Sequence, residues 1–144
     1  ATAALEEGAD SASFAELDRR TRQAIALLGT LGVGKSDRVA WLGKNAKLYF
    51  ELFYACGRAG VVMVPVGWRL APPEVRYILE DTGARLLLVG EGLEEAAAGA
   101  CKGMAAPPPI VTANEARKHM ATASSPAAFD PAGPDDPVLQ LYTS

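Results

Sequence analysis

The chain has 144 residues, 49% of them hydrophobic, which is enough apolar material for one domain with a buried core. A formal net charge of -3, with Lys and Arg scattered along the chain, argues against nucleic-acid binding. The longest apolar runs fall far short of the roughly 20 residues of a transmembrane helix, and the two cysteines lack disulfide-framework or zinc-site spacing, so we expect a cytoplasmic chain with buried free thiols.

The first predicted element is a helix. Ser13 and Glu16 have the spacing of a capping box, and apolar residues then recur at helical intervals from about Phe14 to Leu31. A glycine in the left-handed conformation commonly ends a helix, so Gly32 or Gly34 is the expected stop.

A strand, a second helix and a second strand follow. Val39 to Leu42 is a short apolar run that predicts a strand, and Asn45 is the expected cap of a helix over Ala46 to Arg58. Gly60 is the expected end of that helix. The next run, Val61 to Val66, is continuously apolar and rich in β-branched residues, which is typical of a strand covered on both faces.

The alternation continues through the middle of the chain. Pro72 and Pro73 favour a helix start, and Gly83 is the expected stop of this third helix. Leu86 to Val89 predicts a third strand, and Glu91 to about Lys102 predicts an alanine-rich helix.

The last part of the chain predicts one more strand–helix unit and a closing strand. Ile110 to Thr112 predicts a short strand, and Asn114 is the expected cap of a helix through Met120. Residues 121–137 are rich in Ala, Ser, Gly, Asp and Pro, which indicates a surface connection that leads to a buried strand over Val138 to Tyr142. Repeated strand–helix units with apolar strands predict an α/β fold with a mostly parallel sheet and helices on both faces.

One stretch matches a nucleotide-binding motif letter for letter. Gly29 to Ser36 has the G-x-x-x-x-G-K-S spacing of a P-loop. A P-loop requires a strand before the glycines and a helix after them, so that backbone N–H groups converge on phosphate. The predicted order here is the reverse, which favours a helix end followed by a turn with Lys35 solvated. A P-loop nucleotide hydrolase that uses Gly29 to Ser36 stays open as an alternative, and so does a non-catalytic α/β interaction domain.

Other chemistry-bearing side chains are sparse. His119 is the only histidine, and no Asp, Glu or Cys cluster at ligand spacing surrounds it, so we expect a surface histidine and no metal site. No serine lies in a G-x-S-x-G elbow, which leaves hydrolase chemistry unsupported.

Several separate segments carry a family resemblance. They are Ser13 to Leu17, similar to S-Y-A-E-L, Leu31 to Ala40, similar to L-G-V-x-x-G-D-R-V-A, Ala59 to Val66, similar to A-G-A-V-x-V-P-V, and Trp68 to Leu79, similar to N-x-R-L with P-x-E-x-x-Y-I-L. Tyr142, Thr143 and Ser144 match the Y-T-S that precedes a glycine-rich phosphate loop. Together these segments resemble the adenylate-forming, AMP-binding enzymes, chiefly acyl-CoA synthetases of the fatty-acid–CoA ligase type. Gly67 departs from the pattern, because many members have Asn there.

The resemblance implies an activity for a longer parent enzyme. That enzyme would join a carboxylic acid, foremost a fatty acid, to ATP, release pyrophosphate, and pass the acyl group from the adenylate to coenzyme A, with Mg²⁺ bridging the phosphates. Thr143 and Ser144 match the family's phosphate-contacting positions, where a hydroxyl donates to a charged oxygen. No catalytic or metal-binding residue is expected in this stretch.

The resemblance also implies that the chain holds only part of this machinery. Residues 1–144 would be a partial N-terminal AMP-binding domain, with residues 121–137 as a surface connection within it. The glycine loop with its lysine, the family's metal-binding glutamate and the C-terminal domain with its catalytic lysine are absent from the sequence, so we expect no turnover and no cofactor for this chain alone. Uncovered strand surface would favour a homo-oligomer.

Overall fold

The computed structural model describes residues 2–123 and 129–143 of the chain. Ser144, one of the two predicted phosphate contacts, lies outside the described residues, and so do residues 124–128 of the predicted connection. Within the described part of the chain, no helix is both long enough and apolar enough to cross a membrane.

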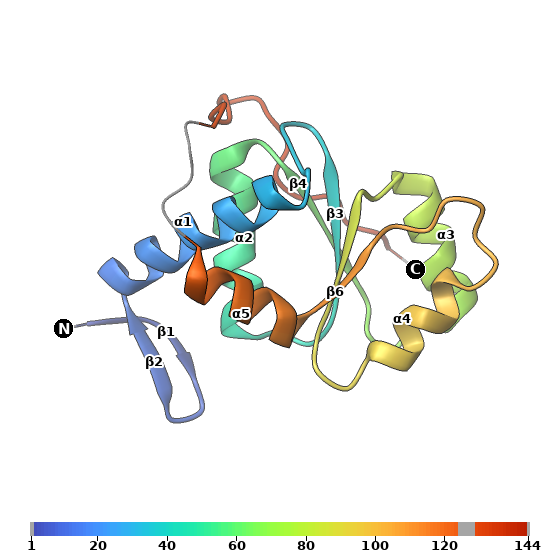
Figure 1. The fold of residues 1–144 in the computed structure, drawn as a ribbon, viewed down its shortest axis with the longest axis horizontal. Coiled ribbons are helices and arrows are strands. Elements are labelled where there is room, and N and C mark those ends of the chain that lie inside the picture. The colour runs from blue at the N-terminus through green and yellow to red at the C-terminus, as the bar shows by residue number, and fades with distance from the viewer. Residues whose placement is uncertain (1, 124–128, 144) are drawn as a thin grey trace.

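A parallel four-stranded sheet runs through the centre of the molecule (Figure 1). Its strands lie in the order β4-β3-β5-β6, and each neighbouring pair is parallel. The strands are β3 (Arg38–Leu42), β4 (Val62–Val66), β5 (Leu86–Val89) and β6 (Ile110–Thr112). The predicted fold class and these four predicted strands are confirmed.

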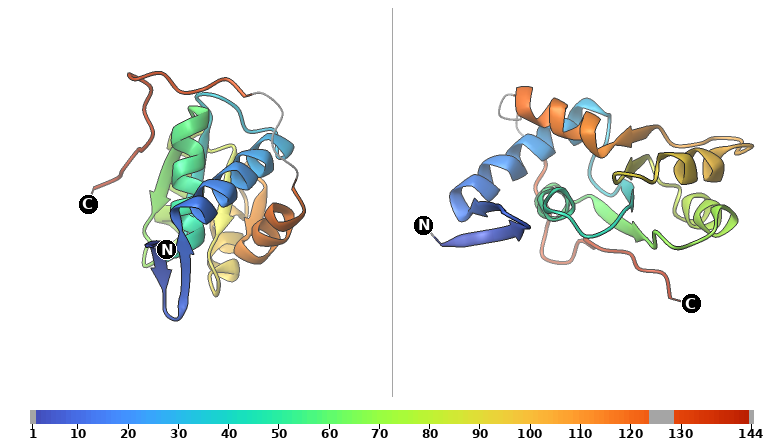
Figure 2. Two further views of the ribbon diagram at one scale, coloured as in Figure 1. Left: turned by 90° about the vertical axis from the view of Figure 1, so that its left-hand side faces the viewer. Right: turned by 90° about the horizontal axis from the view of Figure 1, so that it is seen from below.

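Within the part of the chain that the structure describes, five helices cover the two faces of this sheet (Figures 1 and 2). One face packs against α1, α2 and α5, and the other face packs against α3 and α4. The helices are α1 (Phe14–Thr30), α2 (Lys47–Ala59), α3 (Pro72–Thr82), α4 (Glu94–Cys101) and α5 (Ala113–Thr122).

Successive residues of each central strand enter opposite cores, because side chains alternate between the faces of a pleated sheet. Trp41 of β3 packs with the α1, α2 and α5 side, whereas Leu42 packs with the α3 and α4 side. In β5, Leu88 and Val89 divide in the same way, and both are fully buried. Burial on both sides explains why these strands are continuously apolar.

Glycines end the helices where the sequence predicts. Gly32, directly after the α1 cap, has φ 75°, and Gly60 and Gly83 cap α2 and α3 with φ 69° and 61°. These left-handed conformations suit glycine because it has no Cβ atom.

The helix starts differ from the predictions in two places. Asn45 does not cap α2, because the cap position is Ala46, and the Lys47 N–H instead donates to Glu7 Oε2 at 3.0 Å. Asn114 does not cap α5, because Thr112 does so, two residues earlier, in a reciprocal pair with Glu115. A contact between distant segments decides the start of α2, whereas the start of α5 is decided by residues of its own first turn.

The predicted capping box of α1 forms only in half. The Ser13 hydroxyl accepts from the Glu16 N–H at 3.2 Å, but the Glu16 carboxylate bonds Arg20 at 2.7 Å. The Glu16 carboxylate bonds Arg20 and not the Ser13 N–H, because a guanidinium–carboxylate hydrogen bond is stronger than one to a neutral N–H.

An N-terminal β-hairpin was not predicted. Strand β1 (Ala3–Glu7) pairs antiparallel with β2 (Asp10–Ser13), and Gly8 in the turn has φ 62°. Figure 1 shows this hairpin projecting beside the start of α1, away from the main sheet. Neither strand contains a continuous run of β-branched or large apolar residues, which hides the hairpin from a search for apolar runs.

The closing strand was predicted to be buried, and this prediction is wrong. Leu139 forms an isolated parallel bridge with Met63 of β4, through the hydrogen bonds Met63 N–H to Val138 O and Gln140 N–H to Met63 O, both 2.9 Å. Leu139 is 37% exposed and Leu141 is 64% exposed. The segment, residues 138–143, is here called the edge segment. It lies at the border of the sheet, where only one flank has a strand to pair with.

A close contact between two glycines allows β3 and β5 to meet at their carboxyl ends, and it predicts the effect of substitution. A Cβ atom on Gly43 would lie 2.8 Å from two ring atoms of Trp41 and 3.1 Å from Gly90 Cα. We therefore expect Gly43→Ala to lower the free energy of unfolding by about 1–3 kcal/mol, measured by urea denaturation.

Gly99→Ala is the matched control for that substitution. Gly99 lies within α4, and the nearest atom to an added Cβ there is Pro72 Cγ at 4.0 Å. The expected change is neutral to stabilising by about 0.5–1 kcal/mol. A Gly43→Ala protein as stable as Gly99→Ala would refute the close-contact interpretation.

Candidate functional site

Thr143 lies at the rim of a groove beside α3, here called the α3 groove. The groove has a volume of about 410 Å³ and is lined by Leu70, Pro73, Glu74, Tyr77, Ile78, Tyr142 and Thr143. Leu70 and Pro73 come from the connection after β4 and from the first turn of α3, so the groove opens toward the carboxyl edge of the sheet. That edge is where ligands bind in open α/β folds.

The edge segment reaches this position after a long return along the outside of the sheet. Figure 2 shows the C-terminal segment passing over one end of the sheet and descending beside β4. The Ala132 N–H donates to Arg58 O at 2.9 Å, and the Met63 bridge then aligns the segment parallel to β4. Parallel alignment with β4 directs the following residues toward the carboxyl edge, and this places Thr143 there.

Tyr142 fastens the edge segment to the α3 side of the molecule. Its ring is half-buried against the core between the sheet and α3, and its hydroxyl donates to Asp81 Oδ2 at 2.5 Å. Desolvation raises the pKa of Tyr142, and the neighbouring Asp81 carboxylate raises it further because the phenolate would be a second negative charge. Tyr142 therefore remains a neutral hydrogen-bond donor at neutral pH.

The start of α3 does not itself offer an anion site. Pro72 and Pro73 have no N–H groups, and the Ala71 N–H already donates to Glu74 Oε2 at 2.7 Å. The α3 groove thus combines apolar walls with the Thr143 hydroxyl and the Glu74 carboxylate. Such a groove offers few hydrogen-bond donors to a charged oxygen, so a bound phosphate would need further donors.

The P-loop alternative is overturned by the order of elements. Gly29 and Thr30 are the last residues of α1, so a helix precedes the glycines and strand β3 follows them. The Gly34 N–H donates to Asp37 Oδ2 at 2.8 Å, and this occupies a donor that phosphate binding would use. The residues close a helix and turn into a strand, as the predicted element order requires.

Lys35 is exposed, as predicted, and it also forms ion pairs that the sequence did not indicate. Its ammonium lies 3.5 Å from an Asp136 carboxylate oxygen and 3.7 Å from an Asp130 carboxylate oxygen, and it also donates to Pro131 O at 3.4 Å. The pKa of Asp136 is lowered, first by the hydrogen bond from the Gly133 N–H and then by Lys35. Lys35 thus fixes the segment that precedes the edge segment.

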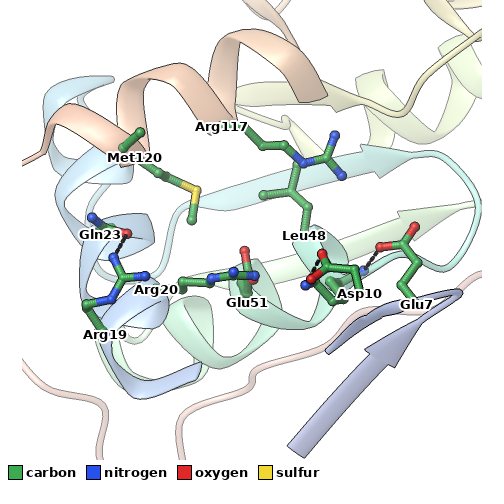
Figure 3. Close-up of a pocket in the computed structure, with 11 residues that line it drawn as sticks. Glu7, Asp10, Arg19, Arg20, Gln23, Leu48, Glu51, Arg117 and Met120 are labelled. Carbon is green, nitrogen blue, oxygen red and sulfur yellow. Dashed lines mark hydrogen bonds and ion pairs between the residues drawn. The ribbon is translucent and has the colours of Figure 1, made fainter. Parts of the chain in front are cut away.

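A second cavity, here called the charged pocket, was not predicted from the sequence. It has a volume of about 420 Å³ and lies between α1, α2, α5 and the hairpin (Figure 3). Its charged lining comes from segments far apart in the sequence: Glu7, Asp10, Arg19, Arg20, Lys47, Glu51 and Arg117. Only the tertiary fold brings these side chains together, and no local motif marks them.

Most charges of this pocket are paired within it. Lys47, which is 6% exposed, bonds the Asp10 carboxylate of the hairpin. Arg20 bonds Glu51 Oε1 at 3.1 Å and also holds Glu16. Burial raises the pKa of Glu51, and Arg20 acts in the opposite direction. These pairs join the hairpin, α1 and α2, which is a structural role.

The cysteine prediction is confirmed. Cys56 and Cys101 are free and buried, and burial raises the pKa of Cys56 to about 12, which leaves its thiol unreactive.

His119 is exposed in the last turn of α5, as predicted. Among the described residues, no group of three or more His, Cys, Asp or Glu side chains could hold a metal ion.

The chain matches one family over its whole length. A family model described as AMP-binding enzyme covers residues 1–144. A fatty acid--[acyl-carrier-protein] ligase, ScoC of Streptomyces coeruleorubidus, is 38% identical over 136 residues, which are 92% of this chain and 25% of that relative. A feruloyl-CoA synthase of Amycolatopsis sp is 36% identical over 141 residues, 98% of this chain and 27% of that relative. The chain spans about a quarter of the length of these curated relatives.

Solved structures show the same arrangement of elements. The crystal structure of the N-terminal domain of FACL13 from Mycobacterium tuberculosis superposes with a TM-score of 0.85 at 29% sequence identity. The superposition covers 94% of this chain and 35% of that structure. The shared fold therefore includes nearly all of the chain.

The buried pair in the charged pocket predicts a pH-dependent loss of stability on substitution. Arg20→Leu leaves the Glu51 carboxylate, 4% exposed, without its guanidinium, and we expect a loss of about 3 kcal/mol near neutral pH. Burial raises the pKa of Glu51 in the folded state, so the folded protein favours the neutral carboxyl group. The stability gained from the neutral form is fully present below the unfolded-state pKa of about 4.3 and is lost as the pH rises through the folded-state pKa. The deficit should therefore shrink as the pH falls to about 4.

Urea unfolding at both pH values measures this effect, with Arg22→Leu as the control. Arg22 is 61% exposed and pairs with Asp18 on the surface, so its loss should cost below about 1 kcal/mol at either pH. An Arg20→Leu deficit that is equal at the two pH values would contradict the assignment to Glu51.

Proposed function

The chain belongs to the AMP-binding enzyme family, and from this we propose that it is the N-terminal part of a longer AMP-forming acid–CoA ligase. The parent enzyme activates a carboxylic acid with ATP as the acyl adenylate, releases pyrophosphate, and transfers the acyl group to coenzyme A. Residues 1–144 are then a partial AMP-binding domain, with residues 121–137 as a connection on its surface. The single observation that carries the proposal is the family match over residues 1–144. The position of Thr143 at the carboxyl edge of the parallel sheet, beside the α3 groove, is consistent with it.

The similar proteins support this class of reaction. One is named a fatty acid ligase with an acyl-carrier protein as the acceptor, and the other is named a feruloyl-CoA synthase. Both names describe the attachment of an acyl group to a carrier. The first names a fatty acid and an acyl-carrier protein, and the second names a feruloyl group and coenzyme A. We propose a fatty acid and coenzyme A for the parent enzyme of this chain, with a cytoplasmic location that suits its two free thiols.

The chemistry of this chain's own residues is limited to the start of the phosphate site. The Thr143 hydroxyl donates to a charged phosphate oxygen, and the Ser144 hydroxyl adds a second donor. Tyr142 and the apolar wall of the α3 groove hold this stretch in place. Mg²⁺ belongs to the parent's reaction, and the described residues offer no group of ligands to hold it.

We expect the 144-residue chain alone to bind Mg–ATP so weakly that binding does not saturate at micromolar concentrations. The family's glycine-rich loop would donate about three hydrogen bonds to phosphate, each worth ~1.5–3 kcal/mol. Without them, binding is weaker by at least about a thousandfold. Isothermal titration measures this directly. Saturable micromolar binding to the isolated chain would contradict the expectation.

Thr143→Val in the parent ligase tests the role of the hydroxyl, because valine keeps the volume and removes the donor. We expect kcat/KM for ATP to fall about 10- to 150-fold, the equivalent of one hydrogen bond to a charged group. Acid-dependent ATP–pyrophosphate exchange is the measurement. Thr122→Val, at the exposed end of α5, is the control and should leave exchange unchanged.

The two levels of the proposal fail in different ways. A parent protein with no acid-dependent exchange would refute the ligase function. Robust exchange that is insensitive to Thr143→Val would refute the phosphate contact alone.

A further inference from the structure

A chain of hydrogen-bonded side chains crosses the edge segment from β3 to α3. The Arg38 Nε–H donates to Gln140 Oε1 at 2.8 Å, the Gln140 Nε2 amide donates to the Tyr142 hydroxyl at 3.2 Å, and that hydroxyl donates to Asp81 Oδ2 at 2.5 Å. Arg38 is the first residue of β3, and Asp81 lies in the last turn of α3. The chain thus ties the edge segment to two elements other than its neighbour β4.

Each link has a defined direction. A guanidinium has donors only, so the Gln140 oxygen must face Arg38 and its amino group must face Tyr142. A carboxylate has acceptors only, so the Tyr142 hydroxyl must donate to Asp81. A positive group at one end and a negative group at the other polarise the intervening links in the same sense, which strengthens each of them.

The backbone alone specifies the register of the edge segment weakly. Within the described residues, one bridge pair, Met63 with Leu139, joins the segment to β4. A slip of one residue would exchange the two faces of the segment, and burial resists that slip little where Leu139 and Leu141 are exposed. Side-chain contacts are therefore needed to define the register.

The hydrogen-bonded chain supplies this specification. Gln140 and Tyr142 are two residues apart, so they project to the same side of an extended segment. A slip by one residue would turn both away from Arg38 and Asp81 and would break all of the links together. The same slip would move the Thr143 hydroxyl to the opposite face of the segment.

We propose that Arg38, Gln140 and Asp81 are positioning residues that set the register of the edge segment and so present the Thr143 hydroxyl to the phosphates of ATP. Their action runs through Tyr142 and requires no contact with the nucleotide. This inference rests on the proposed ligase function and extends it to residues that lie outside the α3 groove.

The first test uses the 144-residue chain and asks whether the side chains hold the segment. Gln140→Leu and Asp81→Ala should each speed hydrogen exchange of the backbone amide at position 140, which bonds Met63 O, by about tenfold relative to its intrinsic rate, as expected for the loss of about one net hydrogen bond. Asp81→Asn should restore much of the protection, because its amide oxygen still accepts from Tyr142. Glu80→Ala, the exposed neighbour of Asp81 in α3, is the matched control with unchanged exchange.

The second test uses the parent ligase and separates positioning from general stability. Asp81→Ala and Gln140→Leu should lower kcat/KM for ATP about tenfold and leave KM for the acid unchanged, a split that a general loss of stability would not produce. Asp81→Asn should fall between Asp81→Ala and the unmodified enzyme. An unchanged kcat/KM for ATP in an active ligase would overturn this inference, whereas an unmodified parent without acid-dependent exchange would refute the proposed function itself.

Discussion

Burial of the two central strands on both faces dictates where the polar chemistry of this chain can lie. Strands β3 and β5 have helices on each side, so every side chain between their ends enters one of two apolar cores. A polar group in these strands would lose its hydration without a partner. Most hydrogen-bonding and charged groups are consequently placed at the strand ends, on the helices and at the sheet border. Among the described residues, Trp41 Nε1 is a buried side-chain donor within β3 that has no hydrogen-bond partner. The Thr143 position is one consequence, because it lies where a strand-like segment leaves the sheet.

The sheet border imposes a different requirement from the centre. Central strands have their register specified by apolar residues on both faces, whereas the edge segment has two exposed leucines and a single bridge to Met63. Charged and polar side chains replace apolar burial there, from Lys35 with Asp136 to Tyr142 with Asp81. An exposed ion pair contributes little stability, but several anchors along one segment restrict its path. The edge segment is thus held mainly by polar contacts, together with the Tyr142 ring that packs against the core.

Sequence patterns predict the parts of this fold that depend on local constraints. Apolar runs revealed the four sheet strands, and glycines marked the ends of α1, α2 and α3 because only a local backbone conformation is involved. The α2 start could not be predicted, since its N–H partner is Glu7, forty residues away. The charged pocket was hidden for the same reason, because Arg20 and Glu51 are 31 residues apart. The closing strand was recognised by its apolar residues, but its exposure depends on which elements lie beside it.

The P-loop match shows why a motif needs its structural context. The glycines of Gly29 to Ser36 end a helix, so no helix N-terminus faces a phosphate and Lys35 has no nucleotide to neutralise. Its ammonium instead lies near the carboxylates of Asp130 and Asp136. These two residues belong to the segment that continues to Leu139, which bridges to Met63 of β4, and then to Thr143. Lysine suits this contact because one compact charge can serve two carboxylates and a carbonyl at once. Lys35 therefore helps to restrict the path of the segment that precedes Thr143.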